Sequence, residues 1–105
     1  MKEIHAFKSA LHQASHETSR VMSRQLRAEA HASGWPSHVV RSMKVNYSEG
    51  NFEAHVHDAH KSEAHDLEYG TPGTQPSAAV RRYANRTHEA ETFLVGRMSK
   101  ILGEL

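Results

Sequence analysis

The chain has 105 residues, of which 37% are hydrophobic, and its 13 basic and 12 acidic residues give a formal net charge of +1. This length allows one small domain, and the near-neutral charge does not by itself support nucleic-acid binding. The lack of cysteine excludes disulfides and cysteine-ligated metal sites, and no apolar run is long enough for a signal peptide or a membrane span. We therefore expect a soluble protein with no membrane partner.

The first predicted element is a long helix over residues 1–33. No proline or glycine occurs from Lys2 to Ala32, and apolar residues recur at helical spacings there: Ile4, Phe7, Leu11, Ala14, Val21, Met22 and Leu26. Gly34 and Pro36 should end this helix. Thirty helical residues span about 45 Å, whereas a compact domain of this size is roughly 35 Å across. The helix should therefore extend beyond its own domain onto a neighbouring copy, or else kink and fold back on one core.

Residues 38–58 are predicted to form a β-hairpin, because apolar and polar residues alternate from Val39 to Tyr47 and again from Phe52 to Val56. The turn is either a two-residue one at Glu49 and Gly50 or a four-residue loop over Ser48 to Asn51 with the same pairing. The expected cross-strand pairs are Tyr47 with Phe52, Val45 with Ala54, Met43 with Val56, and Arg41 with Asp58. This register places apolar residues opposite apolar ones and a charge opposite its counterpart.

The connecting segment, residues 59–76, begins with a polar stretch that has room for one helical turn, after which Glu68 and Tyr69 are expected to be briefly extended. Two glycines and two prolines between Gly70 and Pro76 then require a turn. A final amphipathic helix is predicted over residues 77–103. Residues 1–105 should thus form a single α+β domain.

The sequence contains no recognisable catalytic motif, so we expect neither an enzyme nor a cofactor. His55, His57 and His60 have a spacing that suggests metal binding, but His55 and His57 lie on the polar face of the predicted hairpin and no fourth ligand is specified. His12 and His16 lack the glutamate of the zinc-protease helix, since Gln13 stands in its place. We assign no metal site, and a metal-dependent protein using the first three histidines remains a minor alternative.

Contact with other molecules is the more promising role for this chain. Trp35 and Tyr69 lie in irregular segments, where each is either a buried plug or an interface anchor, and the loop from Thr71 to Gln75 should be exposed enough to reach another subunit. The predicted subunit-interface residues are Trp35, Leu67, Glu68, Tyr69, Gly70, Thr71, Pro72, Gly73 and Pro76.

A group of arginines in the last predicted helix forms a second candidate contact. Arg81, Arg82 and Arg86 are candidates for binding DNA or an acidic partner. The alternative is a solvated helix face that Glu89 and Glu91 balance.

The order of a long helix, a hairpin, the segment Leu67-Glu68-Tyr69-Gly70-Thr71, a proline-containing loop and a final helix resembles a phage family. This is the tail-completion or head-to-tail joining family of long-tailed bacteriophages, which includes minor tail proteins of the lambdoid Z type. The resemblance covers about Lys2 to Leu102. Members commonly carry a Pro…Thr-Gly-x-Leu stretch before the first strand, whereas this chain has Gly34-Trp35-Pro36-Ser37-His38-Val39.

The resemblance implies a structural virion protein, assembled in the host bacterial cytoplasm, that forms a homo-oligomeric ring at the head–tail junction. The ring is usually sixfold, contacts other neck and tail proteins, and has DNA passing through its lumen without sequence specificity. Its role would be neck or tail completion, or tail termination. The alternative from another class is a small nucleic-acid-binding or regulatory protein that uses the basic C-terminal helix.

Overall fold

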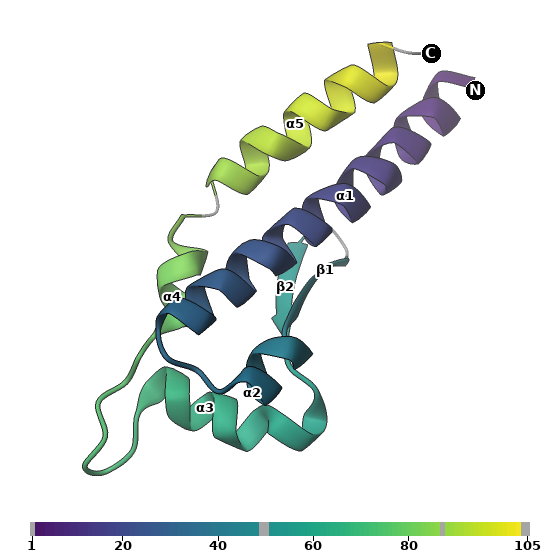
Figure 1. Ribbon diagram of the computed structural model, residues 1–105. Helices are drawn as coiled ribbons and strands as arrows, with labels where there is room; N and C mark the ends of the chain where they lie inside the picture. Colours follow the sequence, from purple (N-terminus) through teal and green to yellow (C-terminus); the bar gives the residue numbers. More distant parts are fainter. Residues whose placement is uncertain (1, 49–50, 87, 104–105) are drawn as a thin grey trace.

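The computed structural model describes the backbone of residues 2–48, 51–86 and 88–103, and the side chains of residues 8–48, 51–86 and 93–100. These residues form an α+β fold, as predicted, which consists of six helical elements and one β-hairpin (Figure 1). In chain order the elements are α1 (Lys2–Ala32), α2 (Ser37–Ser42), β1 (Lys44–Ser48), β2 (Asn51–His55), the 3-10 turn η1 (Asp58–His60), α3 (Lys61–Tyr69), α4 (Ala79–Ala84) and α5 (His88–Gly103).

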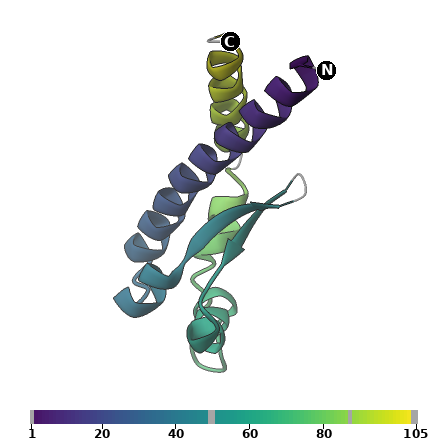
Figure 2. The same cartoon turned by 90° about the vertical axis from the view of Figure 1, so that its right-hand side faces the viewer.

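Helix α1 has the predicted length and is one continuous helix, so it does not fold back on itself. It ends where glycine permits a left-handed residue: Gly34 has φ +85°, and the Trp35 N–H closes the helix end by donating to the Ala30 carbonyl at 3.0 Å. The molecule is 58 Å long but only 24 by 19 Å in cross-section. Helix α1 runs along the long axis and contacts α2, β1, α4 and α5 (Figures 1 and 2).

The hairpin has the predicted register in its described part but is shorter than predicted. Val45 pairs with Ala54 and Tyr47 pairs with Phe52, while the turn at Glu49 and Gly50 lies outside the described residues. The predicted start of the strand at Val39 was wrong, because Ser37–Ser42 forms helix α2 instead. The pairs of Met43 with Val56 and Arg41 with Asp58 are therefore absent.

Two features explain why helix α2 forms: the proline that precedes it and the burial of two adjacent valines. Pro36 occupies the N-cap position, with a φ of −59° that suits a helix start. Val39 and Val40 are adjacent and both buried, which a helix lying on the core allows and a strand with one solvated face does not.

The connecting segment is mostly helical, and two expectations for it were wrong. Residues 58–69 form η1 and the nine-residue helix α3 rather than a polar stretch with one helical turn, and Glu68 and Tyr69 end helix α3 instead of being extended. Helix α3 is fixed by Glu68, whose carboxylate accepts hydrogen bonds from the N–H groups of Val80 (2.9 Å) and Arg81 (3.0 Å) at the start of α4. Local sequence patterns do not predict such tertiary hydrogen bonds.

The prediction of one C-terminal helix over residues 77–103 was also wrong, since the chain forms α4 and α5 with a break after Ala84. Helix α4 buries Ala79 and Tyr83 in the main core, and α5 places Leu94 and Met98 against α1. Figure 1 shows that the two helices follow different directions, so one straight helix would not make both sets of contacts.

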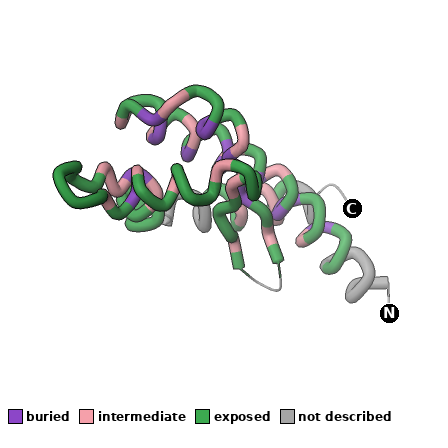
Figure 3. The backbone as a smooth tube through the Cα atoms, turned by 90° about the horizontal axis from the view of Figure 1, so that it is seen from below, coloured by how far each residue is buried: buried purple, intermediate pink, exposed green. Residues whose placement is uncertain are grey.

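The buried apolar residues form two separate clusters along α1. The main core joins α1, α2, β1 and α4 through the residues Met22, Leu26, Ala30, Trp35, Val39, Val40, Met43, Val45, Ala79 and Tyr83. The second cluster consists of Ala10 and Ala14, packed against Leu94 and Met98 of α5. Figure 3 shows the buried positions as short stretches between exposed ones. We call the paired portions of α1 and α5 at the second cluster the arm.

Candidate nucleic-acid interface

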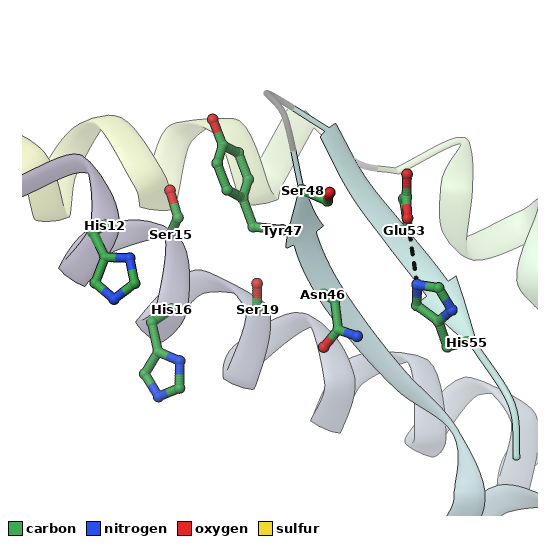
Figure 4. A pocket seen from close by; sticks show the side chains of 9 residues that line it. All are labelled: His12, Ser15, His16, Ser19, Asn46, Tyr47, Ser48, Glu53 and His55. Carbon is green, nitrogen blue, oxygen red and sulfur yellow. Dashed lines mark ion pairs between the residues drawn. The ribbon is translucent and has the colours of Figure 1, made fainter. Parts of the chain in front are cut away.

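An open groove runs between α1 and the hairpin. Two adjoining hollows of about 500 and 350 Å³ share His16, Ser19 and Asn46 and so form one continuous surface. The groove is fixed by Ser23 of α1, whose hydroxyl accepts a hydrogen bond from the Val45 N–H at 2.8 Å and thereby ties β1 to the helix. The side chains that line the larger hollow are shown in Figure 4.

One end of the groove is strongly basic. Arg20, Arg24 and Arg27 are spaced by four and three residues and so lie on one face of α1, and Lys44 adds a charge from the start of β1. Arg27 is held in place by donating a hydrogen bond to the Met43 carbonyl at 2.8 Å. Among the side chains that the structure describes, none forms an ion pair with Arg20, Arg24 or Lys44. This end therefore presents uncompensated positive charge to solvent.

The other end of the groove is polar and rich in hydrogen-bonding groups. His12 and His16 extend from α1, and His55 lies on β2 with its Nε2 3.4 Å from a carboxylate oxygen of Glu53 (Figure 4). The hydroxyl groups of Ser15 and Ser19 are buried and have no hydrogen-bond partner within the described part of the chain. Apart from the Glu53 carboxylate, the groove is thus lined by cationic and neutral hydrogen-bonding groups, which are suited to contacts with a sugar–phosphate backbone.

The arginines singled out from the sequence have acidic partners within the chain. Arg81 lies 2.9 Å from Glu68, and Arg82 and Arg86 lie 3.1 and 3.0 Å from the two carboxylate oxygens of Glu29 on α1. The balancing acids are therefore Glu29 and Glu68, whereas the side chains of Glu89 and Glu91 lie outside the described ones. Because these two carboxylates offset part of the three positive charges, Arg81, Arg82 and Arg86 attract phosphate less than the groove does.

Some predicted interface residues are part of the chain's own interior. Trp35 is 4% exposed and its Nε1–H donates to the Ser77 hydroxyl at 2.6 Å, which in turn donates to the Leu67 carbonyl at 2.7 Å. Leu67 packs against the main core, and Glu68 is buried at the start of α4. These three residues bind α3, the following loop and the core together.

The remaining predicted interface residues lie at the surface, apart from the half-buried Gly70. Tyr69 is 55% exposed, with the Arg81 guanidinium 4.6 Å from the centre of its ring. Thr71 and Thr74 form a small backbone bridge, which shapes the loop between them. The exposed members of the predicted set are Tyr69, Thr71, Pro72, Gly73 and Pro76. They form one projecting surface at the end of the molecule opposite the arm (Figure 1).

Sequence reasoning missed the basic groove although part of its signal was present. The spacing of Arg20, Arg24 and Arg27 marks a basic stripe on a helix that was itself predicted correctly. Lys44 adds its positive charge to the groove only because of the way the hairpin packs on α1. Local sequence patterns do not predict this packing.

Comparison with protein-family models, with curated proteins and with solved structures gives no match for this chain. Within the described ranges, the helices lack the combination of length and apolar character needed to cross a bilayer. The case for a function accordingly rests on the molecule itself.

Proposed function

We propose that this chain is a structural subunit that assembles with copies of itself, and that the assembly is the ring at the head–tail junction of a long-tailed phage. The observation that carries the proposal is the arm. Its cluster consists of two alanines on α1 packed against Leu94 and Met98 of α5, and Phe93 and Val95 on the same stretch of α5 remain 36% and 63% exposed. Exposed apolar side chains on a projecting element favour burial against another chain.

The two ends of the molecule differ, which favours a ring over a symmetric dimer. The arm lies at one end and the surface of Tyr69 and the loop from Thr71 to Thr74 lies at the other (Figure 1). A contact between unlike surfaces repeats from copy to copy and closes into a ring when the rotation allows it. We expect the loop surface of one copy to contact the arm or the hairpin of the next.

The basic groove agrees with a ring through which DNA passes. Positive charge attracts the DNA backbone whatever its base sequence, and Arg20, Arg24 and Lys44, which have no ion-pair partner among the described side chains, supply such charge. We propose the location at the head–tail junction because the segment from Leu67 to Thr71 resembles that phage family. Other neck and tail proteins would contact the upper and lower faces of such a ring.

Assembly is tested first with the purified full chain, by sedimentation velocity and native mass spectrometry across a range of concentrations. We expect a closed oligomer, and we expect the double variant Phe93→Ser, Val95→Ser and the variant Tyr69→Ala each to yield folded monomers. Lys100→Ala, an exposed change on the same helix α5, is the matched control and should assemble normally. A wild-type chain that stays monomeric at every concentration would contradict self-assembly.

The location is tested separately by electron microscopy of phage particles assembled with this chain or without it. We expect a ring at the neck in the first case and tails that fail to join heads in the second. Normal joining without the chain would refute the phage role while leaving self-assembly intact.

The basic groove also favours a second candidate, a small nucleic-acid-binding or regulatory protein that acts as a monomer. This candidate predicts salt-dependent DNA binding by the isolated chain without oligomer formation. It differs from the alternative that the sequence suggests in using α1 and β1 rather than Arg81, Arg82 and Arg86.

A further inference from the structure

Three side chains from separate elements meet on the surface formed by α2, η1 and α3. His38 lies in α2, His60 ends η1, and Glu63 lies in the first turn of α3. The Nε2 atom of His38 is 2.5 Å from a carboxylate oxygen of Glu63, and the rings of His38 and His60 are 5.2 Å apart between centres. One nitrogen or oxygen atom from each residue lies within 4.8 Å of the other two.

The local backbone explains why these residues meet. His57 caps η1 by accepting a hydrogen bond on Nδ1 from the Ala59 N–H at 3.2 Å, and the His60 N–H donates to the His57 carbonyl at 2.8 Å. The tight turn that results leads directly into α3, where Glu63 follows His60 by three residues and faces the same way. Helix α2, which was not predicted from the sequence, brings His38 to the same place.

We propose that His38, His60 and Glu63 bind a zinc ion, with water in the fourth position. Two imidazole nitrogens and one carboxylate oxygen are a donor set that zinc accepts, with bonds of about 2.0–2.2 Å in a tetrahedral arrangement. Such an arrangement places the donor atoms about 3.3 Å apart. The atoms here lie between 2.5 and 4.8 Å apart, so small side-chain rotations bring them to that spacing. His38 and Glu63 have the freedom for this, since their side chains are 49% and 45% exposed.

The site differs from the histidine set that the sequence suggests and shares only His60 with it. His55 lies on β2 beside Glu53, and the Nδ1 of His57 is already used by the Ala59 N–H. Zinc in the new site would connect α2 directly to α3, the helix that carries Glu68 and Tyr69. Its effect would therefore be to fix α3 on the core, and this holds whether or not the chain forms a ring.

The test is zinc binding by the untagged full chain after removal of metal with a chelator. Titration calorimetry with zinc chloride should show one tight site per chain, and X-ray absorption should show two imidazole nitrogens and one carboxylate oxygen on the metal. Glu63→Gln and His38→Asn should each weaken binding by about 100-fold or more, since even outer partners of metal ligands contribute 10–100-fold. A hundredfold excess of zinc over its Kd should raise the Tm of the wild type by about 10 °C and leave that of Glu63→Gln nearly unchanged.

Two matched variants distinguish this site from adventitious binding to the many histidines. His55→Asn and His12→Asn each remove an exposed histidine outside the cluster, and both should retain wild-type affinity and stoichiometry. Equal binding by Glu63→Gln and the wild type, or loss of binding in His12→Asn or His55→Asn, would overturn the proposal. Circular dichroism of the metal-free variants confirms that each remains folded, which the exposure of His38 and Glu63 leads us to expect.

Discussion

Glu68 and Arg81 join helices α3 and α4 through both their side chains and their backbones. The Glu68 carboxylate, on a residue only 5% exposed, accepts hydrogen bonds from the Arg81 N–H and from its Nε–H at 3.0 and 2.9 Å. In return, Arg81 donates through Nη2 to the Glu68 carbonyl at 2.7 Å. An acidic side chain at a helix N-terminus satisfies N–H groups that would otherwise lack partners and interacts favourably with the helix dipole.

We expect Glu68→Ala to lower the free energy of unfolding by about 2 kcal/mol, because it leaves the partly buried N–H groups of Val80 and Arg81 and the half-exposed guanidinium of Arg81 without their acceptor. Glu68→Gln keeps the shape and one acceptor oxygen, so its cost should be about half as large. Guanidinium denaturation followed by circular dichroism measures both. Glu53→Ala, at an exposed position on β2, is the control, and an equal loss in Glu53→Ala and Glu68→Ala would contradict the role assigned to this pair.

Gly70 should tolerate substitution much less well than Gly34, although both have positive φ angles of +80° and +85°. A Cβ atom at residue 70 would lie 2.7 Å from the Thr74 carbonyl oxygen and 2.9 Å from the Pro76 nitrogen, and both are backbone atoms. A Cβ at residue 34 meets nothing within 4 Å. We expect Gly34→Ala to cost about 1 kcal/mol and Gly70→Ala about 3 kcal/mol or more. Thermal denaturation of the two variants would refute this if they lost equal stability.

The ion pair of Glu17 with Arg97 should make the attachment of α5 to α1 depend on pH. The hydrogen bond from Arg97 lowers the pKa of Glu17 below its ordinary value of 4.5. A lowered pKa means that the pair stabilises the fold fully above about pH 4.5 and loses this effect as the pH falls through the lowered value.

The stability difference between the wild type and Arg97→Gln should therefore be constant near neutral pH and become smaller in acid, as Glu17 is protonated. Urea denaturation at a series of pH values measures it. Arg20→Gln, which removes a charge without a partner among the described side chains, should show no such pH dependence. A difference between the wild type and Arg97→Gln that was equally large at pH 2 and at neutral pH would show that the contribution of Arg97 does not depend on the charge of Glu17.

DNA binding by the chain should depend on the groove more than on Arg81, Arg82 and Arg86. Replacing Arg20, Arg24 and Lys44 with glutamine should lower the slope of log K against log salt by about 1 for each phosphate that is no longer neutralised. The triple change of Arg81, Arg82 and Arg86 to glutamine should have a smaller effect on binding, since these charges already have acidic partners. Fluorescence anisotropy with a short duplex at several salt concentrations distinguishes the two surfaces. A greater weakening of binding in the variant of Arg81, Arg82 and Arg86 would reverse the assignment.

The sequence predicted the parts of the fold that repeat a local pattern. Helix α1 has a long apolar stripe and a glycine stop, and the pairs of Val45 with Ala54 and Tyr47 with Phe52 follow from alternation. Prediction was wrong where tertiary contacts decide the backbone. Val39 and Val40 are buried together on α2, and the carboxylate of Glu68 organises the start of α4 from twelve residues away.

The candidate site was less accessible to sequence reasoning than the fold. The spacing of Arg20, Arg24 and Arg27 can be recognised in the sequence. The carboxylate that pairs with Arg82 and Arg86, however, belongs to a helix more than 50 residues earlier in the chain. Only the folded structure shows which basic residues lack an acidic partner. The same is true of the contact between His38 and Glu63.

Helix α1 belongs to two apolar clusters of very different size, and this divides the helix energetically although its backbone is continuous. Its second half is covered by the main core, whereas Ala10 and Ala14 are covered, among the described side chains, by Leu94 and Met98 of α5. Amide hydrogens before about Thr18 should exchange with solvent through local opening of the arm, while those after it should exchange only when the whole domain unfolds. A boundary between fast and slow exchange would then fall within a single helix, and assembly would move it toward the N-terminus.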